Sequence, residues 1–172
     1  MSWSNRLCRP LVAAAALSLG LGGCFQPLYA PINGIDAGEE LRAVEIDPIP
    51  ERLGHYLHNE LVLAFDGAGG GTPRKYHLEV VARERLLTPL VDTFSGRADS
   101  ATIAVEADYR LVPIGGGEPV AVGTAITNAS YDRSAQRFAN IRAARDSEIR
   151  VARTLADQIR TRVAAALAAP PR

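Results

Sequence analysis

The chain has 172 residues with 19 basic and 19 acidic side chains, so the full sequence carries no formal net charge. With 47% hydrophobic and 22% charged residues, its composition is that of a globular protein rather than a disordered one. A nucleic-acid-binding protein needs an excess of Lys and Arg to neutralise phosphates, and this balance argues against that class.

The first 23 residues have the pattern of a secretory signal peptide. Arg6 and Arg9 make a short basic start, and an apolar run of 11 residues follows from Leu11 to Leu21. A transmembrane helix takes about 20 apolar residues, so this run is too short to span a bilayer stably. A basic segment followed by an apolar run of this length is typical of exported proteins. We therefore predict that residues 1–23 are removed.

The signal segment ends in Leu21-Gly22-Gly23-Cys24, which resembles the bacterial lipobox. Small residues before the cysteine let the chain lie extended in a peptidase groove, and the thiol can take a thioether-linked diacylglycerol. The alternative is an ordinary signal peptide that happens to end near a cysteine. We predict lipid attachment at Cys24. Residue 25 is Phe rather than Asp, which by resemblance to enterobacterial sorting points to the periplasmic side of the outer membrane.

Removing 23 of the 172 residues leaves 149, with Cys24 as their sole cysteine. If lipid occupies that cysteine, no disulfide can form in the exported protein. The fold must then be stabilised by its core, and a domain of about 150 residues buries roughly 68–70% of its unfolded surface. The mature chain has 17 basic and 19 acidic groups, a formal charge of −2.

The mature chain begins with a segment, 24–40, whose prolines, glycines and lack of periodicity predict an extended tether. A short strand is expected over 41–47, ended by two prolines that cannot donate to a β-ladder. From 51 to 65 the period changes, since apolar residues recur every four positions at Leu53, Leu57, Leu61 and Phe65. This spacing predicts a helix with one apolar face.

Three strands and a long helix are expected in the rest of the chain. Alternating apolar and polar residues predict strands from Tyr76 and from about Thr102, the second being the cleanest alternation. A Gly-rich turn leads into a third strand, which begins around Val120 and runs to about Tyr131. The last element is a helix over 140–168 with an apolar stripe of these residues: Ile141, Ala144, Ala152, Leu155, Ile159, Val163 and Ala166.

This order, β-α-β-β-β-α, predicts an α+β fold in a single domain over 41–169. Two amphipathic helices on one face of a small, mostly antiparallel sheet make a two-layer sandwich.

The sequence offers little for catalysis or metal binding. It lacks a free thiol in the mature chain and a nucleophile elbow. His55 and His58 lie three residues apart without an evident third ligand, and His77 falls on the expected wet face of its strand. A Gly-rich stretch before Lys75 has neither the spacing nor the order of elements of a phosphate loop. We expect no enzymatic activity, no catalytic residues, no cofactor and no metal.

The arginines are more informative, because the planar guanidinium fork suits phosphate. Arg97 precedes the second of the three strands, and Arg133 and Arg137 flank the entry to the last helix. The alternative is that these side chains are solvated and balance acidic neighbours.

Two segments resemble the LPS-assembly lipoprotein LptE family in its alphaproteobacterial form. The first is Cys24-Phe25-Gln26-Pro27-Leu28-Tyr29, which lacks the glycine that often follows the cysteine. The second runs from Ala129 through Ser134, Phe138-Ala139-Asn140 and Arg145-Asp146 to Arg162. With the order of elements, the resemblance covers essentially the whole mature chain.

The resemblance implies a non-enzymatic protein that plugs the LptD outer-membrane barrel, assists its assembly and binds lipopolysaccharide. Basic residues near strand ends contact lipopolysaccharide in that family, so Arg97, Arg133 and Arg137 are nominated for this role. The alternative function is an auxiliary lipoprotein of a phospholipid-transport ABC system, which would also have a lipid anchor and a small α/β domain.

Overall fold

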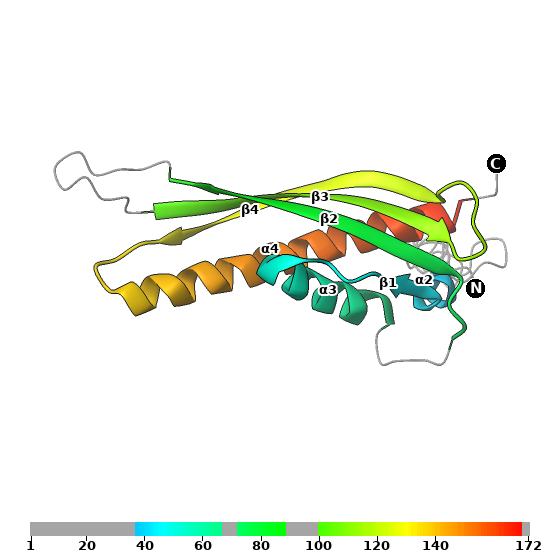
Figure 1. The fold of residues 1–172 in the computed structure, drawn as a ribbon, viewed down its shortest axis with the longest axis horizontal. Helices are drawn as coiled ribbons and strands as arrows, with labels where there is room; N and C mark the ends of the chain where they lie inside the picture. The colour runs from blue at the N-terminus through cyan, green and yellow to red at the C-terminus, as the bar shows by residue number, and fades with distance from the viewer. Residues whose placement is uncertain (1–36, 67–71, 89–99, 170–172) are drawn as a thin grey trace, which may run out of the picture.

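A computed structural model describes residues 37–66, 72–88 and 100–169 of the chain (Figure 1). The elements in these ranges are, in chain order, α2 (Ala37–Arg42), β1 (Val44–Ile46), α3 (Glu51–Asp66), β2 (Tyr76–Leu87), β3 (Ser100–Pro113), β4 (Ala121–Asp132) and α4 (Arg137–Leu167).

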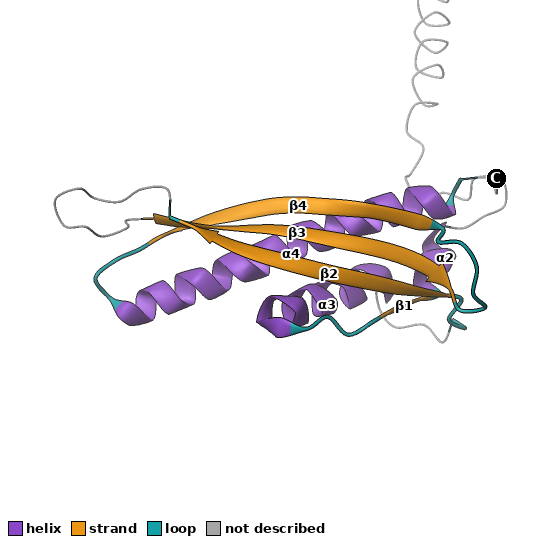
Figure 2. Ribbon diagram, turned by 45° about the horizontal axis from the view of Figure 1, so that its top comes forward, coloured by secondary structure: helices purple, strands orange, loops and turns teal. Residues whose placement is uncertain are grey.

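The four strands form one sheet in the order β1-β2-β3-β4. Strand β1 pairs parallel to β2 because helix α3 carries the chain back between them, whereas β2–β3 and β3–β4 pair antiparallel. The helices lie on one face of this sheet, as Figure 2 shows. The predicted α+β two-layer sandwich with a mostly antiparallel sheet is therefore confirmed.

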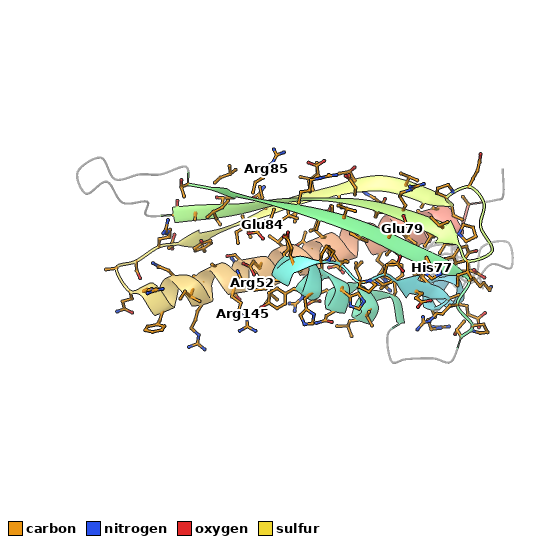
Figure 3. The ribbon with its side chains drawn as sticks, in the orientation of Figure 1. Arg52, His77, Glu79, Glu84, Arg85 and Arg145 are labelled. Carbon is orange, nitrogen blue, oxygen red and sulfur yellow. The ribbon has the colours of Figure 1, made fainter. Side chains whose placement is uncertain are left out.

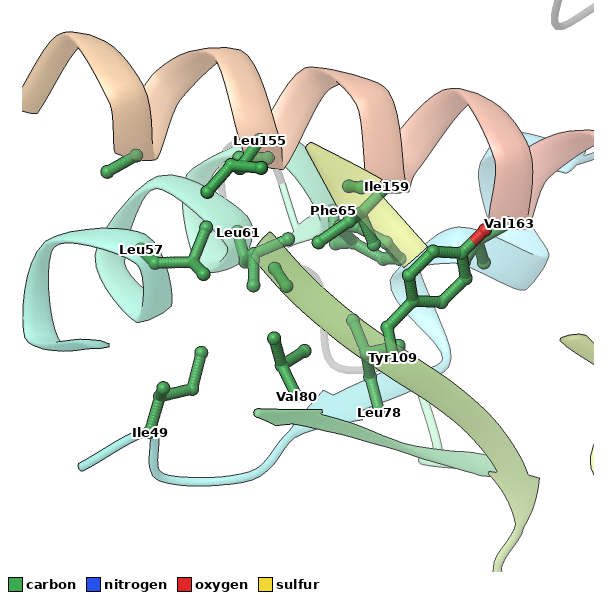
Figure 4. Close-up of a cluster of buried hydrophobic side chains, with 14 of the residues drawn as sticks. Ile49, Leu57, Leu61, Phe65, Leu78, Val80, Tyr109, Leu155, Ile159 and Val163 are labelled. Carbon is green, nitrogen blue, oxygen red and sulfur yellow. The ribbon is translucent and has the colours of Figure 1, made fainter. Parts of the chain in front are cut away.

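The core lies between the sheet and the two longer helices (Figure 4). The four-residue spacing in α3 buries Leu53, Leu57, Leu61 and Phe65, as the sequence predicted. The predicted alternation in β3 is also confirmed, since its inward-facing residues are all buried: Ile103, Val105, Ala107, Tyr109 and Leu111. From α4, the stripe that includes Leu155, Ile159 and Val163 closes the core.

Strand β4 buries its small residues and exposes its branched ones. Ala125 is fully buried, whereas Val122 and Ile126 on the opposite face are each 66% exposed. Helix α4 packs directly over β4. There is little room even for a methyl group at Gly123, where an added Cβ would lie 2.6 Å from the Tyr109 Oη. At Gly123 the Tyr109 ring of the neighbouring strand β3 thus occupies the space that a side chain would need.

The start of the domain differs from the sequence prediction. Residues 37–42 form helix α2, so the part of the expected tether that the structure describes is helical, and the strand is reduced to Val44–Ile46. Leu41, predicted to begin the strand, is instead buried on α2. Two glutamates in the first turn and Arg42 in the last match the helix dipole. The remaining tether residues, 24–36, lie outside the described ranges.

Polar side chains of α4 cover the outer edge of β4. Arg150 donates to the Ser130 carbonyl at 3.1 Å and Gln158 donates to that of Ile126 at 3.4 Å. Arg162 donates in the same way to the Thr124 carbonyl. These bonds occupy carbonyls that an added strand would need, so they protect the edge from pairing with another chain.

Candidate functional site

One end of the sandwich gathers three strand ends and the start of the long helix. Strand β2 ends there and β3 begins there, and β4 leads there into α4, whereas α2 lies at the opposite end (Figure 1). Helix α4 has 31 residues, which corresponds to a length of about 45 Å. We call the end formed by Leu86, Leu87 and residues 132–145 the tip.

The β4–α4 connection at the tip is held by one asparagine. The Asn140 side-chain amide accepts from the Ser134 backbone N–H at 2.8 Å and donates to the Ser134 carbonyl at 2.9 Å. The Ser134 hydroxyl in turn accepts from the Gln136 backbone N–H at 3.2 Å. These bonds tie the connection to the first turn of α4, whose N-cap residue Gln136 makes no side-chain cap hydrogen bond. They fix the backbone on which Arg133 and Arg137 stand.

Arg133 and Arg137 are exposed, and within the part of the chain that the structure describes neither has an ion-pair partner. Other arginines behave differently: Arg83, for example, pairs with Asp108 at 2.5 Å. From residue 133 to residue 145 there are four arginines and no acidic residue. The tip is therefore a locally positive surface on a chain without net charge.

Two of the predicted site residues cannot be placed. Cys24 and Arg97 both lie outside the described residues. The strand ends that flank the segment of Arg97, Leu87 of β2 and Ser100 of β3, are at the tip. The structure thus brings two of the three nominated arginines, Arg133 and Arg137, to the same end of the molecule.

Just behind the tip, ionic contacts join the two long helices. Arg52 of α3 donates to the carboxylate of Glu148 on α4 through two nitrogens, with Nε–Oε2 at 2.8 Å. Arg145 lies over the Tyr56 ring, 5.8 Å from its centroid. Figure 3 shows Arg52, Glu84 and Arg145 near one another, where α3 begins beside α4. Partial desolvation and the nearby Glu148 raise the pKa of Glu84 above its usual value.

Beyond this junction, apolar side chains at the tip remain uncovered. Phe138 is 81% exposed and Ile141 is 52% exposed, although Ile141 was predicted to lie on the buried stripe of the helix. The prediction for Ile141 was wrong because helical periodicity shows which face is apolar but not how far a neighbouring element extends. One sequence signal could have pointed to Phe138. It lies within residues 133–145, which contain four arginines and no acidic residue.

The histidines make local contacts that do not indicate a metal centre. His55 and Asn59 on α3 lie 3.2 Å apart through their side-chain nitrogens, and His77 lies 3.3 Å from the Asp47 carboxylate. Across the described ranges, no three His, Cys, Asp or Glu side chains are grouped as metal ligands would be. Nor does any helix within those ranges have the length and apolar character needed to cross a membrane.

The fold is shared with solved structures of bacterial lipoproteins. A Caulobacter crescentus CB15 protein described as a lipoprotein superposes with a TM-score of 0.64 at 24% sequence identity, covering 78% of this chain and 97% of that one. A minor lipoprotein from Acinetobacter baumannii superposes with a TM-score of 0.53 at 16% identity, covering 71% of this chain and 90% of that one. No protein-family model and no curated protein matches the sequence. At these identities the likeness establishes the fold.

Proposed function

We propose that this protein is an outer-membrane lipoprotein that binds the LptD barrel as plug and assembly partner and binds lipopolysaccharide on its way to the outer leaflet. The observation that carries the proposal is the positive tip, where Arg133 and Arg137 stand exposed without an ion-pair partner in the described chain. Guanidinium groups of this kind bind the phosphates of lipid A in a bidentate manner.

Two further features support the proposal. The lipobox ending at Cys24 supplies an anchor, since each buried acyl CH₂ contributes about 0.8 kcal/mol and several chains hold a protein durably. The fold is the one found in the lipoproteins from Caulobacter and Acinetobacter. The tip lies far from α2, the described element nearest the anchor in sequence, so an anchored molecule can present its arginines away from its own lipid (Figure 1).

The proposal describes a binding protein rather than an enzyme. Its partners are the barrel, lipopolysaccharide and the membrane through the N-terminal lipid. The competing proposal, an auxiliary lipoprotein of a phospholipid-transport ABC system, predicts an inner-membrane transporter as partner instead of a barrel.

A pull-down of the full-length lipoprotein from its native membranes in mild detergent separates these two proposals. Mass spectrometry should find a large barrel of the LptD type in stoichiometric amount. Recovery of ABC-transporter subunits without a barrel would contradict the LptE-like function and favour the competing one. A Cys24→Ala chain serves as the control for recovery through the membrane anchor.

A further inference from the structure

In the described chain, helix α3 does not extend as far toward the tip as α4 does. Helix α3 begins at Glu51, and Arg52 contacts Glu148. Helix α4 starts at Arg137, so about three turns precede this contact. In Figure 1 these turns extend past α3 along the sheet. Over this stretch of the described chain, no second helix packs beside α4 as α3 does in the core.

Apolar side chains on both layers remain exposed where α3 is missing. Leu86 lies on the same face of β2 as the buried Leu78 and Val80, and it pairs in register with the buried Ile103. It therefore faces the helical layer, yet it is 57% exposed. Ile141 lies two turns before the buried Glu148 on the same face of α4 and is 52% exposed. Both faces that form the core elsewhere thus continue, uncovered, into the tip.

Phe138 extends this apolar surface along the side of α4 that α3 covers farther on. It lies on the helical face of Arg145, which contacts Tyr56 of α3, and of the buried Ala152 and Ala156. At 81% exposure it is the most exposed large hydrophobic residue in the described ranges. Phe138 and Ile141 are exposed one turn apart on α4, and Leu86 is exposed on the facing side of β2, so the apolar surface at this end is a candidate binding surface.

Along α4 and its entry, from residue 133 to residue 145, the charged residues at the rim of this surface are all arginines. Arg142 follows Phe138 by four residues, and Arg145 follows Ile141 by four, so both arginines lie beside these apolar side chains on the surface of α4. Arg133 and Arg137 stand at its end. A ligand that fits must therefore combine an apolar part with negative charge. A second copy of this chain does not fit this description, because two tips that faced each other would place arginines against arginines.

We propose that the open end of the sandwich seats an acyl chain of a phosphate-bearing lipid against Leu86, Ile141 and Phe138, with its phosphates on the arginines of 133–145. This inference rests on the proposed function, under which the lipid is lipid A. It adds that recognition includes the acyl chains and not only the phosphates. Apolar contact of this kind contributes to affinity in proportion to the area removed from water.

Photocrosslinking in native membranes tests the inference on the full-length lipoprotein. Separate variants carry p-benzoyl-phenylalanine in place of Leu86, Phe138 or Ile141. Leu63 on α3 and Val122 on the outer face of the sheet are the matched controls, since they are 65% and 66% exposed. After irradiation, mass spectrometry identifies what is joined to each position. We expect lipid A adducts at the three tip positions and none at the two controls.

The outcomes distinguish the inference from the function on which it rests. Glycerophospholipid adducts confined to the tip would leave an acyl chain seated there but contradict the lipopolysaccharide function. Adducts to protein alone, or equal lipid yields at tip and control positions, would overturn the inference. In that case the barrel pull-down could still succeed, so the proposed function would stand without an acyl-chain site.

A substitution series gives a second readout that does not depend on the photoreactive group. Ile141→Ser should weaken binding of purified lipopolysaccharide by about tenfold, because a half-exposed aliphatic side chain has limited area to bury. Val122→Ser, at a residue of similar exposure away from the tip, should leave binding unchanged. Thermal melting of both variants checks that the fold is intact. Equal affinity of Ile141→Ser and the parent protein would contradict the inference.

Discussion

Arg52 and Glu148 form an ion pair in which one partner is exposed and the other is buried. The Glu148 side chain is 3% exposed and the Arg52 side chain 67%, and the Arg52 Nε lies 2.8 Å from a Glu148 carboxylate oxygen. The pair joins the first turn of α3 to α4 at the point where the two-helix layer begins. A carboxylate placed this deep needs its partner, because an uncompensated buried charge is costly.

Replacing Arg52 by methionine should therefore destabilise the protein. The side chain keeps its apolar length, but Glu148 loses its donor, and we expect a loss of about 1–3 kcal/mol in the free energy of unfolding. Urea denaturation of the parent and the variant measures this. The double variant Arg52→Met/Glu148→Leu should recover most of the loss, since neither charge remains. Equal stability of the single variant and the parent would mean that Glu148 is hydrated.

Glu84 should limit stability at neutral pH. Partial desolvation, followed by the charge of Glu148, raises the pKa of Glu84 above its ordinary value of 4.5, although the residue as a whole is exposed. The folded state therefore binds this proton more tightly than the unfolded state, so stability is lost as the pH rises through the folded-state pKa. Glu84→Gln should melt at a higher temperature than the parent at neutral pH. This difference should disappear below the ordinary pKa, and a constant difference at all pH values would contradict the assignment.

The buried stripe of α4 is tested by a charge at its centre. Leu155 is fully buried between the helices and the sheet, so Leu155→Asp should destabilise the fold by more than about 3 kcal/mol. Its exposed neighbour Thr154 provides the control, because Thr154→Asp adds the same charge on the outer side of the helix. Circular dichroism melting should show a large drop only for the first variant. Similar melting curves would place the wrong face of α4 in the core.

Charge reversal at the tip tests the phosphate contacts. Glutamate at Arg97, Arg133 and Arg137 together should weaken lipopolysaccharide binding by at least about tenfold while leaving the melting temperature near that of the parent. Arg133 and Arg137 are exposed and, in the described part of the chain, make no ion pair whose loss would affect the fold. Lysine at the same three positions should give an intermediate affinity, since the charge remains but the planar fork is lost. Unchanged affinity would remove these residues from the site.

Lipidation depends on a single side chain. Cys24→Ala should abolish acylation and leave an uncleaved or mislocalised precursor. Intact mass spectrometry and detergent phase separation measure both effects. A processed protein of unchanged mass that still partitions with membranes would show that Cys24 is not the attachment site.

The periodicity of the sequence determined the elements whose environment is uniform along their length. Strand β3 lies inside the sheet with helices over one face only. Its apolar residues are therefore the buried ones, and the polar residues that alternate with them lie on the other face. Helix α3 packs along its length on the core, and its four-residue spacing gave its buried face. The two-layer α+β class followed from the order of these elements alone.

Only the tertiary structure decided which residues lie where elements meet or part. In β4, hydrophobicity would favour Val122 and Ile126 as core residues, but the inner face carries Gly123, against which the Tyr109 ring of β3 packs, and the fully buried Ala125. Along α4, one apolar face continues through Ile141 to the core, yet the first turns extend past α3, and their apolar residues remain exposed. A sequence pattern reports the preferences of one segment, whereas burial depends on how far its neighbours extend and how closely they approach.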